Sequence, residues 1–325
     1  MRADFETVKA ITVGAVRIWE REDGVHFSRF TEEEEAGWYT CSKVLGDRCR
    51  SLCGIRIDFK TDAKEIAFLL SSGNKVDVWL NGVYNRTLYF ADLRESGATE
   101  VRIPLVDQLG APYSETRVTL WLPCHGGGVL GFLDADGATY IRPVEYRHRI
   151  LFLGDSITQG WNSARESMSF ASRITRFFDA HSVNCAVGGG YFSTATIGVN
   201  GYNPEAITIA YGTNDFTHWE SFEELHEHCT DYLDKVKALY PDVPTFVITP
   251  IIRHDNAPRK AGSFDLVRKT VAEEAEKRGM IVVDGFSIFP TDDYYFAGDG
   301  VHPNEAGFAE YAFALIPRLQ QVLHW

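Results

Sequence analysis

The alternation of hydrophobic and polar residues changes character near residue 147. Before that point, apolar and polar residues alternate in short runs, at residues 55–59, 75–80 and 117–122. A period of two places one set of side chains on a core face and the other toward solvent. Asn81-Gly82 directly follows the second run and is a hairpin-turn signal. Many short strands without intervening helices predict an antiparallel, jelly-roll-like β-sandwich over residues 1–147.

From residue 148 onward, short continuous apolar runs replace this alternation. Such runs suit strands buried on both faces of a parallel sheet, and they lie at 150–153, 183–187, 206–210, 245–249 and 280–283. Helical patterns separate or follow them, at 167–180, 221–239, 263–278 and about 304–323. Alternating strands and helices predict an α/β domain over 148–325, a parallel sheet with helices on both faces. Ligands bind such sheets at the carboxyl ends of the strands.

Composition and charge narrow the class of protein. The 325 residues are 45% hydrophobic and 24% charged, which excludes collagen, coiled coil and wholesale disorder. The formal charge of −13 disfavours a nucleic-acid partner, because the densest basic groupings, at 147–149 and 259–260, are too short to follow a phosphate backbone. No run reaches the roughly 18 apolar residues of a membrane helix, so we expect no membrane partner.

The first residues and the cysteines bear on location and cofactors. No basic segment leading into an apolar run opens the chain, so we expect no secretory signal and a cytoplasmic location. Reduced thiols are then the expected state of the six cysteines. Cys49 and Cys53, with Cys41 nearby, weakly resemble a metal site, but no second Cys/His pair at zinc-finger spacing follows. We therefore expect no metal and no cofactor; the sequence is silent on the oligomeric state.

A serine lies where the ligand crevice of the predicted sheet would open. Residues 154–160, Gly-Asp-Ser-Ile-Thr-Gln-Gly, follow the first buried run, and Ser156 stands between strand and helix. A serine hydroxyl becomes a nucleophile only when a base accepts its proton. The alternative interpretation is a helix cap, since Ser and Asp both accept hydrogen bonds from the first helical N–H groups.

A histidine that could serve as the base appears near the end of the chain. In residues 299–304, Asp-Gly-Val-His-Pro-Asn, a carboxylate precedes His302 by three positions. On a loop, Asp299 can fold back to hold one ring nitrogen, which fixes the tautomer and stabilises the imidazolium. An ordinary turn is the alternative, because Asp, Gly and Pro are common loop residues.

Acyl transfer also needs hydrogen-bond donors aimed at the developing oxyanion. Gly188-Gly189-Gly190 follows the run at 183–187, and glycine lets a backbone N–H approach a ligand closely. Asn214 follows the run at 206–210, and its amide can donate. A flexible turn and an Asx turn are the respective alternatives.

Taken together, these segments resemble the four blocks of the SGNH (GDSL-type) hydrolase family. The resemblance covers about residues 149–325 and rests on Gly154-Asp155-Ser156, Gly189, Gly212-x-Asn214 and Asp299-x-x-His302. It implies that Ser156 is the nucleophile, His302 the general base and acid, and Asp299 its orienter. It further implies an oxyanion hole made by the N–H groups of Ser156 and Gly189 and the side chain of Asn214, with Gly188 and Gly190 one position away. Thr158 stands where a Gly-x-Ser-x-Gly elbow requires glycine, which argues against an α/β-hydrolase.

A β-sandwich before such a domain is similar to the architecture of carbohydrate acetyl esterases of the second carbohydrate-esterase family. Members of that family often lack the triad carboxylate, whereas Asp299 is present here. The resemblance implies a serine esterase that removes acetyl or other short acyl groups from a sugar. Trp161 could offer a flat apolar face to the sugar ring, with a buried core position as the alternative.

Two other functions remain open. The same residues would serve a short-chain lipid esterase or a thioesterase, which differ only in the acyl donor. A non-catalytic carbohydrate-binding protein, with recognition by the sandwich, is the alternative outside enzymes. The expected partner in each esterase reading is a small acylated molecule.

Overall fold

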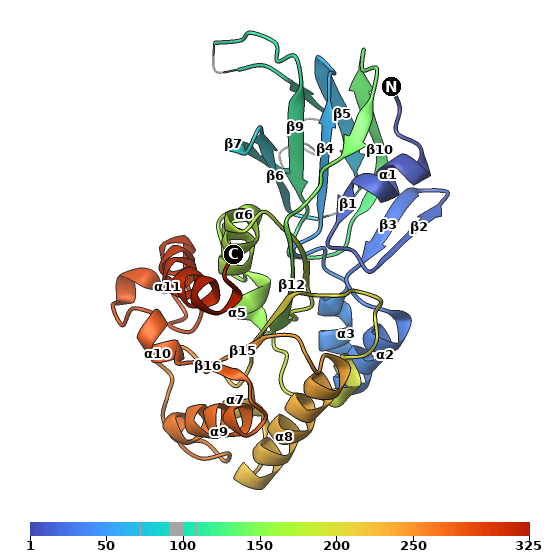
Figure 1. The fold of residues 1–325 in the computed structure, drawn as a ribbon. Coiled ribbons are helices and arrows are strands. Elements are labelled where there is room, and N and C mark those ends of the chain that lie inside the picture. Colours follow the sequence, from blue (N-terminus) through green and yellow to red (C-terminus); the bar gives the residue numbers. More distant parts are fainter. Residues whose placement is uncertain (72, 91–99, 108) are drawn as a thin grey trace. The chain divides into compact units, whose positions relative to one another are not determined.

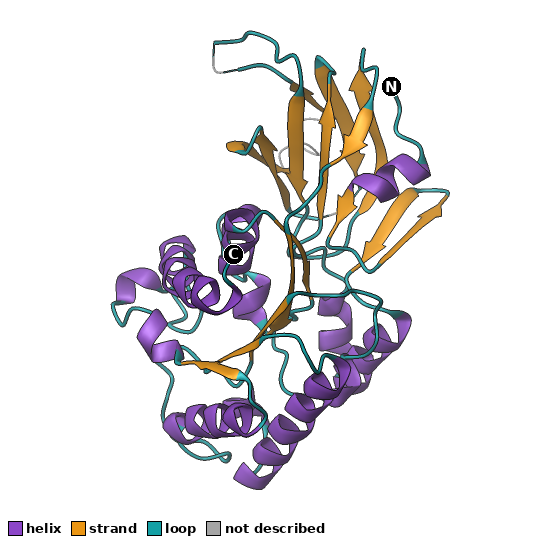
Figure 2. Cartoon of the chain, viewed as in Figure 1, coloured by secondary structure: helices purple, strands orange, loops and turns teal. Residues whose placement is uncertain are grey.

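The computed structural model describes residues 1–71, 73–90, 100–107 and 109–325 and separates the chain into two compact units (Figures 1 and 2). The first unit comprises Met1–Arg29, Arg50–Tyr146 and Arg165–Ser167. The second comprises Phe30–Cys49, Arg147–Ala164 and Met168–Trp325. Each unit therefore includes a short segment from the other half of the chain.

Among its described residues, the first unit contains two antiparallel sheets, one of six strands and one of five. One runs in the order β1 (Thr12–Val13), β4 (Arg56–Thr61), β9 (Thr116–Trp121), β6 (Lys75–Leu80) and β7 (Val83–Tyr89), and β11 (Ile141–Pro143) also pairs with β4. The other runs in the order β2 (Arg17–Arg21), β3 (Gly24–Ser28), β10 (Val129–Asp136), β5 (Glu65–Leu70) and β8 (Val101–Pro104). The predicted sandwich is confirmed.

The three alternating runs of the sequence form β4, β6 and β9 of this sandwich. Their inward side chains, among them Ile57, Val78 and Leu120, are buried in one core together with residues of the opposite sheet. The predicted Asn81-Gly82 turn joins β6 to β7. Both residues have positive φ, 52° and 77°, as a two-residue hairpin turn of type I′ requires.

Helices in the N-terminal half contradict the prediction that this half has strands alone. In the described part of this half they include α1 (Phe5–Ile11), α2 (Glu32–Cys41) and α3 (Lys43–Cys49). At α2, the Thr31 hydroxyl accepts the N–H of Glu34 at 3.1 Å, and the Glu34 carboxylate accepts the N–H of Thr31 at 2.9 Å. This capping box, a threonine three residues before a glutamate in an acidic run, was the signal in the sequence.

Helices α2 and α3 also place the domain division differently from the predicted boundary at residue 147. Residues Phe30–Cys49 group with the second unit, and Arg165–Ser167 group with the first. The reason is packing. A Cβ at Gly37 of α2 would lie 1.7 Å from the carbonyl oxygen of Ala195, so the helix backbone rests directly on the loop that follows β13 (Ala180–Asn184).

The second unit is built on a parallel sheet, as predicted. The strand order is β13, β12 (His148–Gly154), β14 (Ala206–Ala210), β15 (Thr245–Ile248) and β16 (Ile281–Val283). Besides α2 and α3, its helices are α5 (Ser156–Gln159), α6 (Phe170–Phe177), α7 (Asp215–His218), α8 (Phe222–Leu239), α9 (Phe264–Lys277), α10 (Gly285–Ile288) and α11 (Glu305–Leu323). The predicted α/β fold is confirmed, and its strand and helix ranges agree with the apolar runs to within a few residues.

Helices cover both faces of this sheet (Figure 1). Ile150 and Phe152 of β12 point into a core with α6 and α11, where the Phe170 and Tyr311 rings stack at 4.2 Å between centroids. Helices α8 and α9 pack together on the opposite face. The side chains of β12 therefore alternate between two cores, which explains the continuous apolar run in the sequence.

The strand order also indicates where a ligand would bind. Strand β12 is second from one edge of the sheet: β13 lies on one side of it, and β14, β15 and β16 follow in sequence order on the other. The chain thus reverses its direction of winding between β12 and β14. Such a switch point opens a crevice at the carboxyl ends of the two strands. Ser156 follows β12 and Asn214 follows β14.

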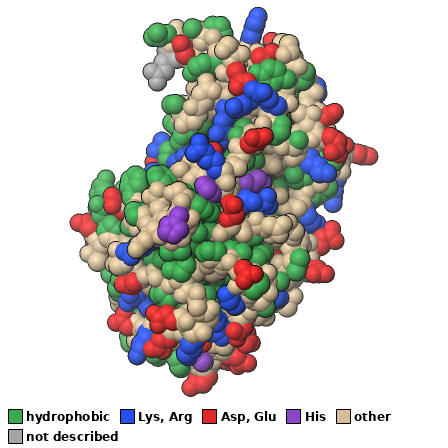
Figure 3. Space-filling view, viewed as in Figure 1, with side chains coloured by type: hydrophobic (Ala, Val, Ile, Leu, Met, Phe, Trp, Pro, Cys, Tyr) green, Lys and Arg blue, Asp and Glu red, His purple; other side chains and the backbone are tan. Residues whose placement is uncertain are grey.

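On the face shown in Figure 3, acidic side chains are scattered among basic and apolar ones. In the part of the chain that the structure describes, no helix is long and apolar enough to cross a membrane. Within the same residues, no group of three or more histidine, cysteine or acidic side chains gathers as a metal ion would require. Cys49 and Cys53 are buried, in the second and first units respectively, and Cys41 is partly buried.

Candidate active site

Ser156 is the first residue of α5, directly beyond the end of β12. The helix cap is Asp155, whose side chain accepts the N–H of Ile157 at 2.9 Å. The capping role is therefore filled by its neighbour, and the Ser156 hydroxyl is engaged elsewhere. Gly154 is required at the turn, because a Cβ there would lie 2.2 Å from the Thr158 hydroxyl oxygen.

The Ser156 hydroxyl meets His302, although 146 positions separate the two residues. Ser156 Oγ lies 2.7 Å from His302 Nε2, and His302 Nδ1 lies 2.7 Å from Asp299 Oδ2. The other Asp299 oxygen accepts the N–H groups of Val301 and His302, each at 2.9 Å. The carboxylate thus folds back onto its own loop in the predicted way, and the three side chains form one hydrogen-bonded chain.

Asp299 is held in its ionised form. Partial burial alone would raise the pKa of its carboxyl group, but the N–H groups of His302 and Val301 outweigh this and hold the pKa below its usual value. The side chain of Asn162 adds a bond from Nδ2 to Asp299 Oδ2 at 3.2 Å. An ionised carboxylate at Nδ1 stabilises the imidazolium that forms when the ring accepts a proton at Nε2.

The glycine loop after β13 leaves one backbone donor open. The N–H of Gly188 donates to Gln159 Oε1 at 2.6 Å, and the N–H of Gly190 donates to the carbonyl of Val187 at 2.8 Å. Within the residues described, the N–H of Gly189 between them has no acceptor. Gly189 has φ +87°, which a residue with a side chain rarely adopts. Of the three glycines, Gly189 therefore has the donor that a ligand could use.

Two further groups at the site can donate a hydrogen bond to a ligand. The N–H of Ser156, at the start of α5, has no acceptor in the described part of the chain. Asn214 Nδ2 donates to the carbonyl of Gly190 at 2.9 Å, which ties Asn214 to the glycine loop. A carboxamide nitrogen carries two N–H groups, so one bond leaves the second for a ligand.

Buried carboxylates fix the loops that carry these donors. Asp215 accepts the N–H groups of Phe192 and Gly212, at 3.0 and 2.9 Å, and so joins the loop after β13 to the loop after β14. Burial raises the pKa of Asp215 to about 6. Burial, with the charge of Asp215 as a smaller cause, raises the pKa of Asp155 to about 7. Both acids therefore titrate nearer neutrality than ordinary aspartates.

Trp161 lies beside the glycine loop and is half-buried. The backbone N–H of Trp161 donates to the carbonyl of Ser156 at 2.9 Å. The indole ring is 3.2 Å from the position that a Cβ would occupy at Gly188. The guanidinium carbon of Arg48 lies 5.3 Å from the centroid of the ring. The sequence could place Trp161 near Ser156 but could not show this neighbour.

Sequence reasoning missed four residues at this site. Gln159 and Asp215 stand inside or next to recognised motifs, so their polar side chains were a usable signal. Asn162 is two residues beyond the first block and has φ +68°, a conformation that asparagine tolerates better than most residues. Arg48 of α3 donates to the carbonyl of Gly188, 140 positions away, and no local pattern could have indicated it.

Residues 152–309 match the model of the GDSL-like Lipase/Acylhydrolase family. These residues form a GDSL-like domain. It contains the loops of Ser156, Gly189, Asn214 and His302 and begins within β12. No curated protein matches the sequence.

Solved structures share the fold across nearly the whole chain. A salicylyl-acyltransferase from a tetracycline biosynthetic pathway has 17% identity and a TM-score of 0.76, covering 96% of this chain and 94% of its own. A candidate GDSL-like lipase from Bacteroides ovatus has 18% identity and a TM-score of 0.74. The match covers 100% of this chain and 98% of the lipase chain. A family two carbohydrate esterase from Clostridium thermocellum, in complex with cellohexaose, has 19% identity and a TM-score of 0.66. The match covers 85% of this chain and 94% of the esterase chain. The GDSL-like domain and the sandwich thus occur together in these structures.

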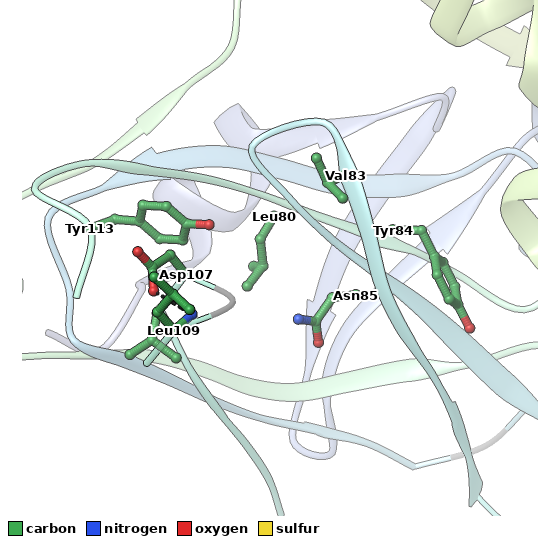
Figure 4. Close-up of a pocket in the computed structure, with 8 residues that line it drawn as sticks. Leu80, Val83, Tyr84, Asn85, Asp107, Leu109 and Tyr113 are labelled. Carbon is green, nitrogen blue, oxygen red and sulfur yellow. Dashed lines mark hydrogen bonds between the residues drawn. The ribbon is translucent and has the colours of Figure 1, made fainter. Parts of the chain in front are cut away.

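A separate pocket lies within the first unit (Figure 4). Its volume is about 570 Å³, and Figure 4 shows Tyr113 and Asp107 on one side of it and Asn85 toward the other. One oxygen of Asp107 already accepts the N–H groups of Leu109 and Ala111. The described lining contains no serine, cysteine or histidine; it consists of Leu80, Val83, Tyr84, Asn85, Val106, Asp107, Leu109 and Tyr113. The described lining therefore has no hydroxyl or thiol paired with a histidine of the kind found at Ser156.

Proposed function

We propose that the protein is a serine esterase that removes acetyl or other short acyl groups from carbohydrate. The observation that carries the proposal is the chain of two 2.7 Å contacts from Ser156 through His302 to Asp299. A serine hydroxyl paired with an oriented imidazole is the arrangement that nucleophilic acyl transfer requires.

The geometry supports a two-step reaction. Ser156 Oγ attacks the ester carbonyl carbon while its proton passes to His302 Nε2, and Asp299 stabilises the resulting imidazolium. The oxyanion accepts hydrogen bonds from the N–H groups of Ser156 and Gly189 and from the Asn214 amide. The sugar alcohol leaves with the proton from His302. Water then attacks the acyl-serine, giving its proton to His302, and the collapse of the second intermediate returns the hydroxyl of Ser156.

Support for a carbohydrate substrate comes from the structural relatives and from one side chain. The Clostridium thermocellum esterase was solved with cellohexaose, and an acetyl xylan esterase also shares the fold, with a TM-score of 0.60. Trp161 presents a half-buried ring beside the glycine loop, a surface suited to the apolar face of a sugar.

A transferase reaction is the second candidate, favoured by the salicylyl-acyltransferase at a TM-score of 0.76. The same acyl-serine would then react with an alcohol acceptor instead of water. Adding methanol or a sugar alcohol separates the two: an esterase releases mainly free acid, and a transferase forms mainly the new ester. A panel of acyl lengths similarly distinguishes short acyl groups from lipid or thioester substrates.

The direct test is hydrolysis of p-nitrophenyl acetate and acetate release from a panel of acetylated oligosaccharides. We expect activity in the wild type and in Ser114→Ala, an exposed serine of the first unit, and its loss in Ser156→Ala. Equal rates in Ser156→Ala and wild type would refute the proposal. Sugar binding without any ester hydrolysis would favour the non-catalytic alternative. We also propose a cytoplasmic location, which cell fractionation tests.

A further inference from the structure

Arg48 of α3 lies against the peptide that joins Gly188 to Gly189. Arg48 Nη1 donates to the carbonyl oxygen of Gly188 at 2.8 Å. The same nitrogen is 2.8 Å from the position of a Cβ at Gly189, so the guanidinium occupies the space that a side chain would need there. Among the described residues, no carboxylate lies within ion-pair distance of Arg48. Its charge is therefore directed at a peptide and at the Trp161 ring.

The bonded peptide is the one that presents the open donor. In a trans peptide the C=O of one residue and the N–H of the next lie in one plane and point in opposite directions. There are no cis peptide bonds among the described residues. The Gly188 carbonyl thus points to Arg48, and the Gly189 N–H points away from it. A charged donor on the carbonyl both fixes this plane and polarises the amide, which strengthens its N–H as a donor.

We propose that Arg48 is a positioning residue for the oxyanion hole, acting through the Gly188–Gly189 peptide. The inference rests on the proposed esterase function and assigns it a residue from the N-terminal half of the chain. Arg48 need not touch the substrate; it holds and activates the donor that does.

The packing of α2 and α3 keeps Arg48 in place. Gly37 of α2 lies against the carbonyl of Ala195, and a Cβ at Gly190 would be 3.0 Å from the Trp38 ring. The Cys41 thiol donates to the Ser193 hydroxyl at 3.3 Å. These contacts all fall on the loop that contains Gly188 to Gly190 and the residues after it. The helical segment therefore supports the oxyanion loop along its length.

The test compares Arg48→Met and Arg48→Lys with a control on the same helix. Direct removal of an oxyanion donor typically costs about 10²–10³ in kcat, so weakening one through its peptide should cost less, about 10–50-fold. We expect this loss in kcat for Arg48→Met, with KM for p-nitrophenyl acetate within about twofold of wild type. Arg48→Lys should be intermediate, since an ammonium can donate to the carbonyl but without the planar fork. Lys43→Met removes an 88% exposed charge from α3 and should leave kcat unchanged.

Two readouts separate positioning from a general structural role. Binding of phenylboronic acid, which forms a tetrahedral adduct with a nucleophilic serine, should weaken in parallel with kcat across the Arg48 series. Added ethylguanidinium should restore part of the activity of Arg48→Ala and none of the activity of Ser156→Ala. Arg48→Lys serves the same comparison if Arg48→Met proves unstable to heating.

The outcomes distinguish this inference from the proposed function. Wild-type kcat in folded Arg48→Met, with Ser156→Ala inactive, would overturn the role of Arg48 and leave the serine mechanism intact. A loss confined to KM, or seen only with acyl donors that carry a negative charge, would also overturn it by making Arg48 a substrate contact. Full activity in Ser156→Ala would instead refute the esterase itself.

Discussion

The two units differ in how they use buried polar groups. In the sandwich, the carboxylate of Asp58 is fully covered and accepts bonds from Arg117 at 2.8 and 3.0 Å, from Thr119 at 3.0 Å and from the Tyr146 hydroxyl. Asp77 likewise accepts from the hydroxyl and the N–H of Ser167, both at 2.7 Å. These acids have their partners within the unit, and their bonds stabilise the fold.

The GDSL-like domain has buried acids of the same kind beside donors without partners. Asp155 and Asp215 fix the loops, whereas the N–H groups of Ser156 and Gly189 have no acceptor within the described residues. Ser156 is buried and Gly189 is partly buried, and backbone donors without a protein acceptor next to a paired serine and histidine are available to a ligand. Open backbone donors therefore distinguish the candidate site from the sandwich acids as much as its reactive side chains do.

The largest effect is expected for His302, the proposed general base. His302→Ala should lower kcat/KM for p-nitrophenyl acetate by about 10⁴-fold or more, because the serine proton then has no acceptor. His26→Ala in the sandwich is the matched control and should keep wild-type activity. Similar activity in both variants would contradict the claim that the reaction depends on the histidine of the GDSL-like domain and not on that of the sandwich.

A smaller effect is expected for Asn214, the proposed oxyanion donor on the loop after β14. Asn214→Ala should lower kcat by about 10²–10³, since one donor to the oxyanion is lost. The exposed Asn256→Ala is the control. Steady-state kinetics separate kcat from KM. A change in KM alone would place Asn214 in ground-state binding and count against an oxyanion role.

In the sandwich we expect a substitution to lower stability and leave kcat unchanged. Asp58→Asn leaves the buried Arg56 and the partly buried Arg117 without their shared charge, and breaking a buried pair costs about 3–5 kcal/mol. Denaturant unfolding should show this loss in the first unit, while kcat measured under folded conditions stays at the wild-type value. A folded Asp58→Asn with strongly reduced kcat would show that the sandwich acids act in the reaction.

The smallest effect concerns pH. The folded pKa of Asp155, about 7, exceeds its ordinary value of 3.8, so the folded state binds more protons than the unfolded state between these values. The ionisation of Asp155 therefore lowers the free energy of unfolding progressively as pH rises through this window. Above about pH 7 this unfavourable contribution has reached its full size. We expect Asp155→Asn, which can still accept the N–H of Ile157, to gain in melting temperature relative to wild type at pH 8 and to lose that gain at pH 4. A constant difference would contradict the raised pKa.

Much of the second unit could be predicted because its signals are local. Each buried strand produces a continuous apolar run, and the four polar motifs directly follow strands or precede the last helix. Ser156 and His302 are far apart in the sequence, but a parallel sheet brings the carboxyl ends of its strands to one edge. Assigning the motifs to that edge was therefore enough to predict that the two residues meet.

What could not be predicted depends on packing between distant segments. The prediction of a helix-free N-terminal half overlooked the capping box at Thr31 and Glu34, which was a local signal. The position of α2 and α3 in the second unit had no such signal, because it depends on the backbone contact of Gly37 with Ala195. Arg48 reaches Gly188 only through that packing. Choosing Gly189 over its neighbours likewise required the bonds made by Gly188 and Gly190.

Covalent labelling tests the central claim most directly. The intact protein is treated with a fluorophosphonate, digested, and analysed by mass spectrometry, in parallel with His302→Ala. We predict stoichiometric modification at Ser156 in the wild type and strongly slowed labelling in His302→Ala. A wild-type protein that is folded yet unlabelled at Ser156, or labelled there equally fast without His302, would contradict the account.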